Sequence, residues 1–436
     1  MKEKGRTIMI GLDGVPYRLL NDLAQKGVMP NVRRIIADGF FRPLASTIPE
    51  VSSVAWSSII TGKNPGEHGI FGFTDIPPHT YRLSFPNFNS LKAEPFWHGN
   101  EGRAVIMNVP STFPAKEMNG VHISGFVSLD LMRSVYPQSL LPQLKAMNYQ
   151  IDVDSAKAHK SMQLFLKNLE QTLEARINVY QYLWEREKWQ TFMLVFTGTD
   201  RLMHFLWDAY EDESHRYHAD FVKHFCRIDD EIGMMLSQLK PNDSFLLMSD
   251  HGFERLDKNV YVNAVLRQAG FLCIPGDSDS NFGQLNEKTC AFSLDPARIY
   301  IHKKDKYPRG RIKKNEIEKL IQEIAAVFQS LEIDGKPVCK RIYRKEEIYS
   351  GPYSADAPDL VLIGNEGINF HSSLKATTVH DRGIFTGKHT HYDAFLLVKD
   401  WAGTDTFCHN LDVGQILDIV NYLKVGKVNI HEKEYA

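Results

Sequence analysis

The sequence has few cysteines, and they are scattered. The five cysteines of the 436-residue chain are Cys226, Cys273, Cys290, Cys339 and Cys408. None forms a CxxC pair and their number is odd, which argues against a disulfide framework. We therefore expect reduced thiols and a cytoplasmic protein.

Long hydrophobic runs are also missing. The longest, such as residues 192–196 and 245–248, are far shorter than the ~20 residues that a transmembrane helix requires. The N-terminal MKEKGRTIMIGLDG has a basic tip, but only a short apolar stretch precedes a glycine turn. We expect neither a membrane span nor a signal peptide.

Charge of one sign is not in excess. The 51 Lys and Arg residues face 53 Asp and Glu, which leaves a formal net charge of −2. This balance argues against a generally basic surface, so no nucleic-acid partner is expected. With 43% hydrophobic residues, the chain has ample material for a large core.

Three apolar, β-rich segments each end in a carboxylate: residues 7–13 (TIMIGLD), 191–200 (TFMLVFTGTD) and 244–250 (SFLLMSD). Their hydrophobicity is continuous, which indicates strands buried on both faces. Further strands are expected at 103–109, 121–125, 360–363 and 394–398, and amphipathic helices at 160–187, 213–239 and 314–331. We predict an α/β fold with a mostly parallel sheet flanked by helices, with ligands at the carboxyl ends of the strands.

The composition changes between residues 253 and 344. This segment is rich in Lys, Asn, Asp and Gly, including DSDSNFG and HKKDKYPRGRIKKNE. We interpret it as an insertion or lid on a catalytic core formed by residues 1–252 and 345–436.

Several strand ends carry side chains that suit a metal ion. Asp200 and His204 are four residues apart, so on a helix they share one face. Asp250 and His251 follow an apolar strand, and Gly252 permits a turn there. Asp13 ends the first strand. Read separately, each has an ordinary alternative: surface pairing, a capping Asp, or an Asx turn.

A possible nucleophile lies in TIPEVSSVAWSSIITG, at residues 47–62. The apolar run ends at Gly62, so Ser52 or Ser53 is expected at a helix N-terminus. Either hydroxyl could be a simple N-cap, or a nucleophile favoured by the helix dipole and a neighbouring metal ion. The GKHTH loop adds His389 and His391 as possible ligands.

Together and in this order, these segments resemble the alkaline phosphatase superfamily, and within it the type I phosphodiesterase and nucleotide pyrophosphatase family. The resemblance covers most of the chain and rests on GLDG, TGKNPGEHGIFGF, TDRLMHF, SDHGF, YVNAVLRQAGFL, KEEIYSGPYSADAPDLVL and the GKH loop.

The resemblance implies two metal sites. The first would consist of Asp200, His204 and His389, and the second of Asp13, Asp250 and His251, with the nucleophile bridging. In nucleotide pyrophosphatases, the nucleophilic Thr lies nine positions before the Thr of a TG pair. Counting back from Thr61-Gly62, this spacing selects Ser52 over Ser53, Thr47 and Ser57. His391 remains an alternate ligand or a substrate contact.

Two departures from the family pattern concern the substrate. The nucleophile is Ser rather than Thr, as in phosphomonoesterases and phosphoglycerate mutases of the superfamily. An Asn that donates to a phosphate oxygen is replaced by Phe73, so Thr74 or Asp75 would have to compensate.

The expected activity is metal-dependent hydrolysis of a phosphodiester through a covalent phosphoseryl intermediate. The alternatives are a phosphomonoesterase or phosphomutase, another transferase or a phosphonate hydrolase, and an inactive, metal-stabilised binding protein. Three Asp and three His ligands suit two divalent ions, Zn²⁺ first and Mn²⁺ second. The expected partner is a small phosphate ester, such as a nucleotide derivative, and the sequence does not indicate an oligomeric state.

Overall fold

The computed structural model describes residues 5–429 except 100, 101, 129, 278, 402, 405, 406, 408 and 409. The chain forms two compact units. Unit 1 contains residues 1–63, 87–253 and 389–436, and unit 2 contains residues 64–86 and 254–388. In the described part of the chain, no helix is long and apolar enough to cross a membrane.

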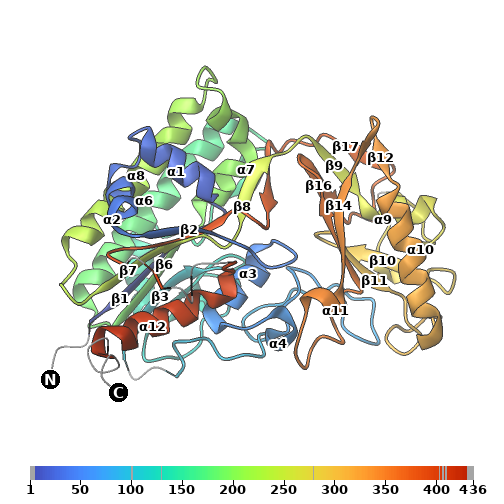
Figure 1. Cartoon of the computed structure of the whole chain (residues 1–436), viewed down its shortest axis with the longest axis horizontal. Coiled ribbons are helices and arrows are strands. Elements are labelled where there is room, and N and C mark those ends of the chain that lie inside the picture. Colours follow the sequence, from blue (N-terminus) through green and yellow to red (C-terminus); the bar gives the residue numbers. More distant parts are fainter. Residues whose placement is uncertain are drawn as a thin grey trace. The chain divides into compact units, whose positions relative to one another are not determined.

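Unit 1 is built on an eight-stranded sheet with the order β2-β19-β7-β1-β6-β3-β4-β5 (Figure 1). Its strands are β1 (Thr7–Leu12), β2 (Phe40–Leu44), β3 (Ala104–Val109), β4 (Gly120–Ser124), β5 (Val135–Tyr136), β6 (Thr191–Phe196), β7 (Ser244–Met248) and β19 (Ala394–Val398). β7, β1, β6, β3 and β4 run parallel, whereas β19, β2 and β5 pair antiparallel at the two sides. The predicted mostly parallel α/β sheet is confirmed.

Helices cover both faces of this sheet (Figure 1). One face carries α1 (Tyr17–Gln25), α2 (Pro30–Asp38), α6 (Met162–Arg186), α7 (Gly198–Glu211) and α8 (His218–Ser237). The other carries α3 (Ser52–Thr61) and α12 (Ile416–Asn429), and a short helix, α5, spans Leu141–Ala146. Every residue of β1, β6 and β7 is buried, as expected for strands covered on both faces.

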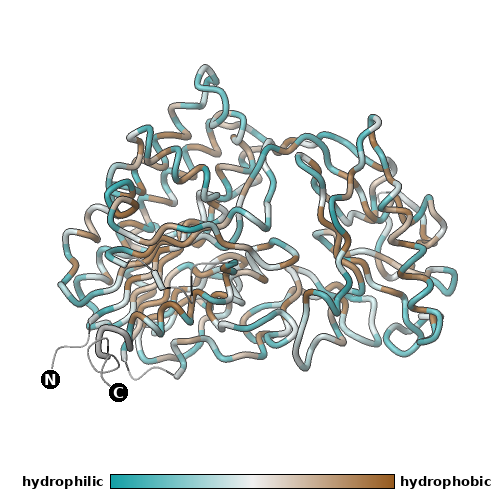
Figure 2. Tube along the Cα trace, in the orientation of Figure 1, coloured by the Kyte–Doolittle hydropathy of each residue, from teal (hydrophilic) through white to brown (hydrophobic). Residues whose placement is uncertain are grey.

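The core explains why these strands are continuously apolar. Trp56 and Ile59 of α3 pack in one cluster with Met9 of β1 and Ile419 of α12. Figure 2 shows the corresponding hydrophobic band along the strands of unit 1. The candidate site lies beyond the carboxyl ends of these strands, on the turns after β1 and β7 and on α3, α7 and β18 (Gly387–Thr390).

Unit 2 contains a four-stranded sheet in the order β10-β11-β15-β14 and a three-stranded sheet in the order β16-β9-β17. Its strands are β9 (Lys258–Tyr261), β10 (Ala291–Leu294), β11 (Arg298–Ile301), β12 (Glu332–Ile333), β13 (Lys336–Pro337), β14 (Cys339–Arg344), β15 (Leu360–Gly364), β16 (Ile368–His371) and β17 (His380–Asp381). Its helices are α4 (Pro65–His68), α9 (Val262–Gln268), α10 (Ile317–Gln329) and α11 (Lys345–Ile348). The strands β8 (Gly252–Arg255) and β18 (Gly387–Thr390) contain two of the chain's crossings between units.

The observed boundary of unit 2 differs from the expected insertion, 253–344. β15 pairs antiparallel with β11 and β14, so residues beyond 344 belong to the same unit up to Lys388. Residues 64–86 also belong to it. Composition did not mark these additions, because LVLI in β15 is as apolar as a strand of the central sheet.

Candidate metal centre and nucleophile

Parallel pairing brings three of the predicted carboxylates to one edge of the sheet. β1 lies between β6 and β7 and is parallel to both. Asp13 directly follows β1, Asp250 follows β7, and Asp200 lies in the first turn of α7 after β6. The carboxyl ends of parallel strands share an edge, so sequence segments almost 240 residues apart meet there.

The second predicted metal site, Asp13, Asp250 and His251, is compact and buried. One potential ligand atom from each residue lies within 4.8 Å of the others. His251 Nε2 is 3.3 Å from Asp250 Oδ2 and 3.8 Å from Asp13 Oδ1. The structure therefore brings all three residues together.

The first predicted metal site is formed by Asp200, His204 and His389. His389 Nε2 lies 3.0 Å from Asp200 Oδ1 and 3.0 Å from His204 Nε2. His204 Nε2 is 3.5 Å from Asp200 Oδ1, as the helical spacing predicted.

His251 joins the two sites. It also groups with Asp200 and His389 within 4.8 Å, and its ring stacks on that of His389 with 3.8 Å between centroids. The six residues thus form one continuous cluster.

Backbone and side-chain groups hold these ligands so that one atom of each faces the cluster. Trp56 Nε1 donates to Asp13 Oδ2 over 3.2 Å, which leaves Asp13 Oδ1 toward His251. Gly14 N donates to Asp250 Oδ1 over 3.0 Å, and Gly14 has a φ of +71°, where glycine is favoured. Asp250 Oδ2 is buried without a hydrogen-bond partner among the described residues. A buried carboxylate oxygen of this kind fits a metal ligand.

Two of the histidines are oriented in the same way. His389 Nδ1 lies 2.9 Å from the Glu50 carbonyl oxygen, and His251 Nδ1 lies 3.1 Å from the Gly252 carbonyl oxygen. An Nδ1–H that donates to a carbonyl leaves Nε2 as the metal-binding nitrogen. Both Nε2 atoms face the carboxylates.

The electrostatics of the cluster favour a cation. Burial, followed by repulsion from Asp250 and Asp200, raises the pKa of Asp13 well above its usual value. Burial raises the pKa of Asp250 to about 7. A divalent ion would supply the positive charge that these carboxylates lack.

The pKa of Asp200 shifts in the opposite direction from those of Asp13 and Asp250, because histidine and arginine side chains surround it. Burial raises its pKa, but the attraction of His204, His389 and Arg201 outweighs burial and lowers it overall. Burial also lowers the pKa of His251, which favours the neutral ligand form.

Ser52 is the hydroxyl that lies against two of the predicted metal ligands, Asp13 and His251. Its Oγ is 3.3 Å from Asp13 Oδ1 and 3.2 Å from His251 Nε2. It is the first residue of α3, whereas the N-cap is Val51, so the simple N-cap alternative does not describe Ser52. Its hydroxyl lies at the positive end of a helix of 10 residues.

The other candidate hydroxyls have different surroundings. Ser53 Oγ is buried without a hydrogen-bond partner in the described part of the chain. Ser57 Oγ donates to the Ser53 carbonyl oxygen over 2.6 Å, and Thr47 Oγ1 donates to the Pro49 carbonyl oxygen over 2.9 Å. Among these four hydroxyls, the structure places Ser52 Oγ against Asp13 and His251, and its role as nucleophile stays a prediction.

The predicted substrate contacts stay predictions. Thr74 and Asp75 belong to unit 2, where the Thr74 carbonyl oxygen accepts a bond from Arg298 and Asp75 pairs through its backbone with Ser84. The carbonyl oxygen of His391 accepts a 2.6 Å bond from Ser46 N in unit 1.

Sequence reasoning missed the groups that hold the ligands, among them Trp56, Glu50 and Arg201. Arg201 NH1 donates to Asp200 Oδ2 over 2.9 Å. Its position inside TDRLMHF was the available signal, since it directly follows a predicted ligand. The Trp56 contact had none, because a tryptophan in an apolar helix predicts only core packing.

Comparison with known proteins gives a family and a fold. Residues 7–392 match the model of the type I phosphodiesterase / nucleotide pyrophosphatase family. A search of curated proteins found no match.

Solved structures of similar fold include two kinds of enzyme. Phosphonoacetate hydrolase from Sinorhizobium meliloti 1021, in complex with phosphonoacetate, has a TM-score of 0.63 and 15% identity, covering 97% of this chain and 96% of that one. Human ectonucleotide pyrophosphatase/phosphodiesterase 5 has a TM-score of 0.58 and 12% identity, covering 96% and 94%. An inactive form of the murine enzyme in complex with AMP has a TM-score of 0.55 and 12% identity, covering 96% and 95%.

Proposed function

This chain belongs to the type I phosphodiesterase / nucleotide pyrophosphatase family, and from that premise we propose that it hydrolyses phosphodiesters through a covalent phosphoseryl intermediate. The observation that carries the proposal is the position of Ser52 Oγ, 3.3 Å from Asp13 Oδ1 and 3.2 Å from His251 Nε2. A hydroxyl against two metal-binding side chains and at a helix N-terminus is placed to act as a nucleophile.

We propose two divalent ions, Zn²⁺ or alternatively Mn²⁺, held by the first and second metal sites as defined above. Carboxylate oxygens and imidazole nitrogens without thiolate suit either ion. When bound, such ions neutralise the charge on the entering and leaving oxygens of a phosphate ester.

The chain's own groups account for the two steps of the reaction. Ser52 Oγ, its proton lost to solvent, attacks phosphorus; the Oγ–P bond forms and the bond to the leaving alcohol oxygen breaks. The leaving oxygen takes a proton from water. In the second step a water oxygen attacks phosphorus, the Oγ–P bond breaks, and Ser52 recovers a proton. The dipole of α3 favours the negative charge on Ser52 Oγ in both steps.

We further propose that Thr74 and Asp75 contact the substrate. The ester is a small molecule, and AMP in the complex of the murine relative supports a nucleotide derivative.

A cytoplasmic location is supported by the scattered cysteines, of which Cys226, Cys273, Cys290 and Cys339 are free thiols.

A panel of a bis-aryl phosphate, an aryl monophosphate and an aryl sulfate tests the activity. We expect the highest kcat/KM for the diester, since a monoester carries an extra charge and the Arg201 guanidinium beside the cluster is engaged by Asp152 and Asp200. Ser52→Ala should abolish turnover with metal content and folding retained, whereas Ser53→Ala should keep substantial activity. Equal loss in both variants would contradict the assignment of Ser52.

A phosphomonoesterase or phosphomutase is the second candidate. The observation that favours it is Ser rather than Thr at position 52, together with Phe73 where a phosphate-binding Asn is expected. A preference for the monophosphate in the same panel would select this alternative.

A further inference from the structure

Asp200 is held by a charged donor, unlike the other two carboxylates of the cluster. Arg201 NH1 donates to Asp200 Oδ2 over 2.9 Å, while Asp200 Oδ1 lies 3.0 Å from His389 Nε2. The corresponding donors to Asp13 and Asp250 are the neutral groups Trp56 Nε1 and Gly14 N. One oxygen of Asp200 is therefore occupied, and the other faces the histidines.

Arg201 is itself fixed by a second carboxylate. Its Nε and NH2 donate to Asp152 Oδ2 over 3.1 Å and 2.9 Å. Its guanidinium lies 4.1 Å from the centroid of the Phe126 ring. The two side chains are only 15% and 14% exposed, so the ion pair is well shielded from water.

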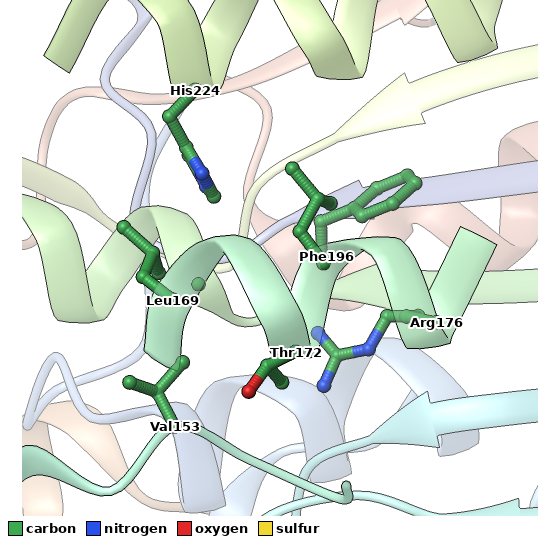
Figure 3. A pocket seen from close by; sticks show the side chains of 8 residues that line it. Val153, Leu169, Thr172, Arg176, Phe196 and His224 are labelled. Carbon is green, nitrogen blue, oxygen red and sulfur yellow. The ribbon is translucent and has the colours of Figure 1, made fainter. Parts of the chain in front are cut away.

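The network of hydrogen bonds from Asp200 continues into the core of unit 1. Thr197 Oγ1 donates to Asp152 Oδ1 over 3.1 Å and accepts a 3.0 Å bond from Arg176 NH1. Arg176 is 2% exposed and also donates to the Ile151 carbonyl oxygen over 2.7 Å. Figure 3 shows Arg176 and Thr172 on α6 at one side of a small cavity and His224 at the other. Arg176 thus anchors the end of this hydrogen-bond network in the packed core of unit 1.

We propose that Arg201 is a positioning residue that, with Asp152, Thr197 and Arg176, holds Asp200 so that Oδ1 alone binds the first metal ion. The inference rests on the proposed two-metal function. Asp152 balances the charge of Arg201, so Asp200 keeps its own negative charge for the ion. This hydrogen-bond network therefore sets the orientation of Asp200, and with it the affinity of the first metal site for its ion.

The contacts of Arg201 argue against a direct role on substrate phosphate. Its Nε, NH1 and NH2 atoms all donate to Asp152 or Asp200. A substrate phosphate would have to displace a shielded carboxylate pair, whereas metal binding at Asp200 Oδ1 leaves all these bonds in place.

Metal binding by the full-length protein tests the proposal. Zn²⁺ is titrated against a chromophoric chelator, and the visible spectrum of the Co²⁺-loaded protein reports coordination. Arg201→Gln should lower the affinity for one of the two ions by about 10–100-fold and leave the affinity for the other within about two-fold of wild type. Asp152→Asn should lower the affinity for the same ion, because Arg201 loses its second charged partner and pairs more strongly with Asp200.

The double variant Asp152→Asn/Arg201→Gln should bind that ion no more weakly than Arg201→Gln, because both substitutions disrupt the same hydrogen-bond network. Arg103→Gln is the matched control, since Arg103 pairs with Glu187 elsewhere in unit 1 and should not affect either ion.

Three outcomes would overturn the inference: unchanged affinities in Arg201→Gln, equal weakening of both ions, or a raised KM for the diester with metal affinity intact. Arg201→Lys serves if Arg201→Gln fails to fold, because it keeps the charge but lacks the guanidinium fork whose three nitrogens bond Asp152 and Asp200, and the same weakening is expected. A wild-type protein that binds no metal would instead refute the proposed function.

Discussion

Replacing Asp250 by Asn should have opposite effects on the metal-free and the metal-loaded protein. Asp250 is fully buried, and its pKa is raised from 3.8 to about 7, first by burial and also by Asp200. A pKa raised in the folded state means that folding binds a proton. The free energy of unfolding of the metal-free protein therefore falls as the pH rises from about 4 to about 7, and the full penalty applies above that.

The magnitude follows from the two pKa values. The rise from 3.8 to about 7, at about 1.4 kcal/mol per pKa unit, makes the ionised Asp250 cost roughly 4 kcal/mol at pH 8. Asn keeps an oxygen to accept from Gly14 N without the charge. With an unfolding entropy of about 2.1 cal/mol/K per residue, Asp250→Asn should raise the Tm of the metal-free protein by roughly 4 °C at pH 8. At pH 4 the gain should vanish.

Calorimetry at pH 4, 6 and 8, with chelator and with saturating Zn²⁺, measures these changes. With Zn²⁺ the variant should melt below wild type, because a charged ligand is lost. Asp243→Asn is the control: Arg6 lowers the pKa of Asp243 despite burial, so its loss should destabilise the protein at pH 8 with or without metal. A metal-free Asp250→Asn protein less stable than wild type at pH 8 would refute the reasoning.

Three further predictions concern metal content. Elemental analysis of protein purified without chelator should show close to two equivalents of Zn or Mn; full activity in metal-free protein would exclude the two-metal mechanism. His389→Ala should lose the first metal preferentially, whereas His391→Ala should keep both, and the reverse pattern would exchange the two assignments. Trp56→Phe removes the Nε1–H that holds Asp13 Oδ2 and should weaken the second site by about 10-fold; unchanged Zn²⁺ affinity in a chelator titration would show that Trp56 serves packing alone.

The sequence predicts the positions of the ligands better than the groups that support them. Continuous apolar strands followed by Asp13 and Asp250 predict one sheet edge, because parallel pairing is implied by burial on both faces. The i, i+4 spacing of Asp200 and His204 needs only a helix. The partnership of Asp152 with Arg201 depends on packing between segments 49 residues apart, and no local pattern encodes it.

The extent of unit 2 shows a similar limit. β15, which pairs with β14 and β11, continues its sheet past residue 344, but β15 has the same apolar pattern as a strand of the central sheet. Hydrophobicity predicts that a strand is buried. It does not predict which of two sheets the strand joins, since that depends on the neighbouring strands.

The ligand cluster also has a consequence for the order of events during synthesis. Its members extend from Asp13, near the start of the chain, to His389, which follows the whole of unit 2. A ribosome would deliver five of the six before the larger segment of unit 2, residues 254–388, and the last only afterwards. From the synthesis of His251 until that of His389, the nascent chain would therefore contain Asp13 and Asp250 but lack one residue of the first site. Only the finished chain could hold both ions.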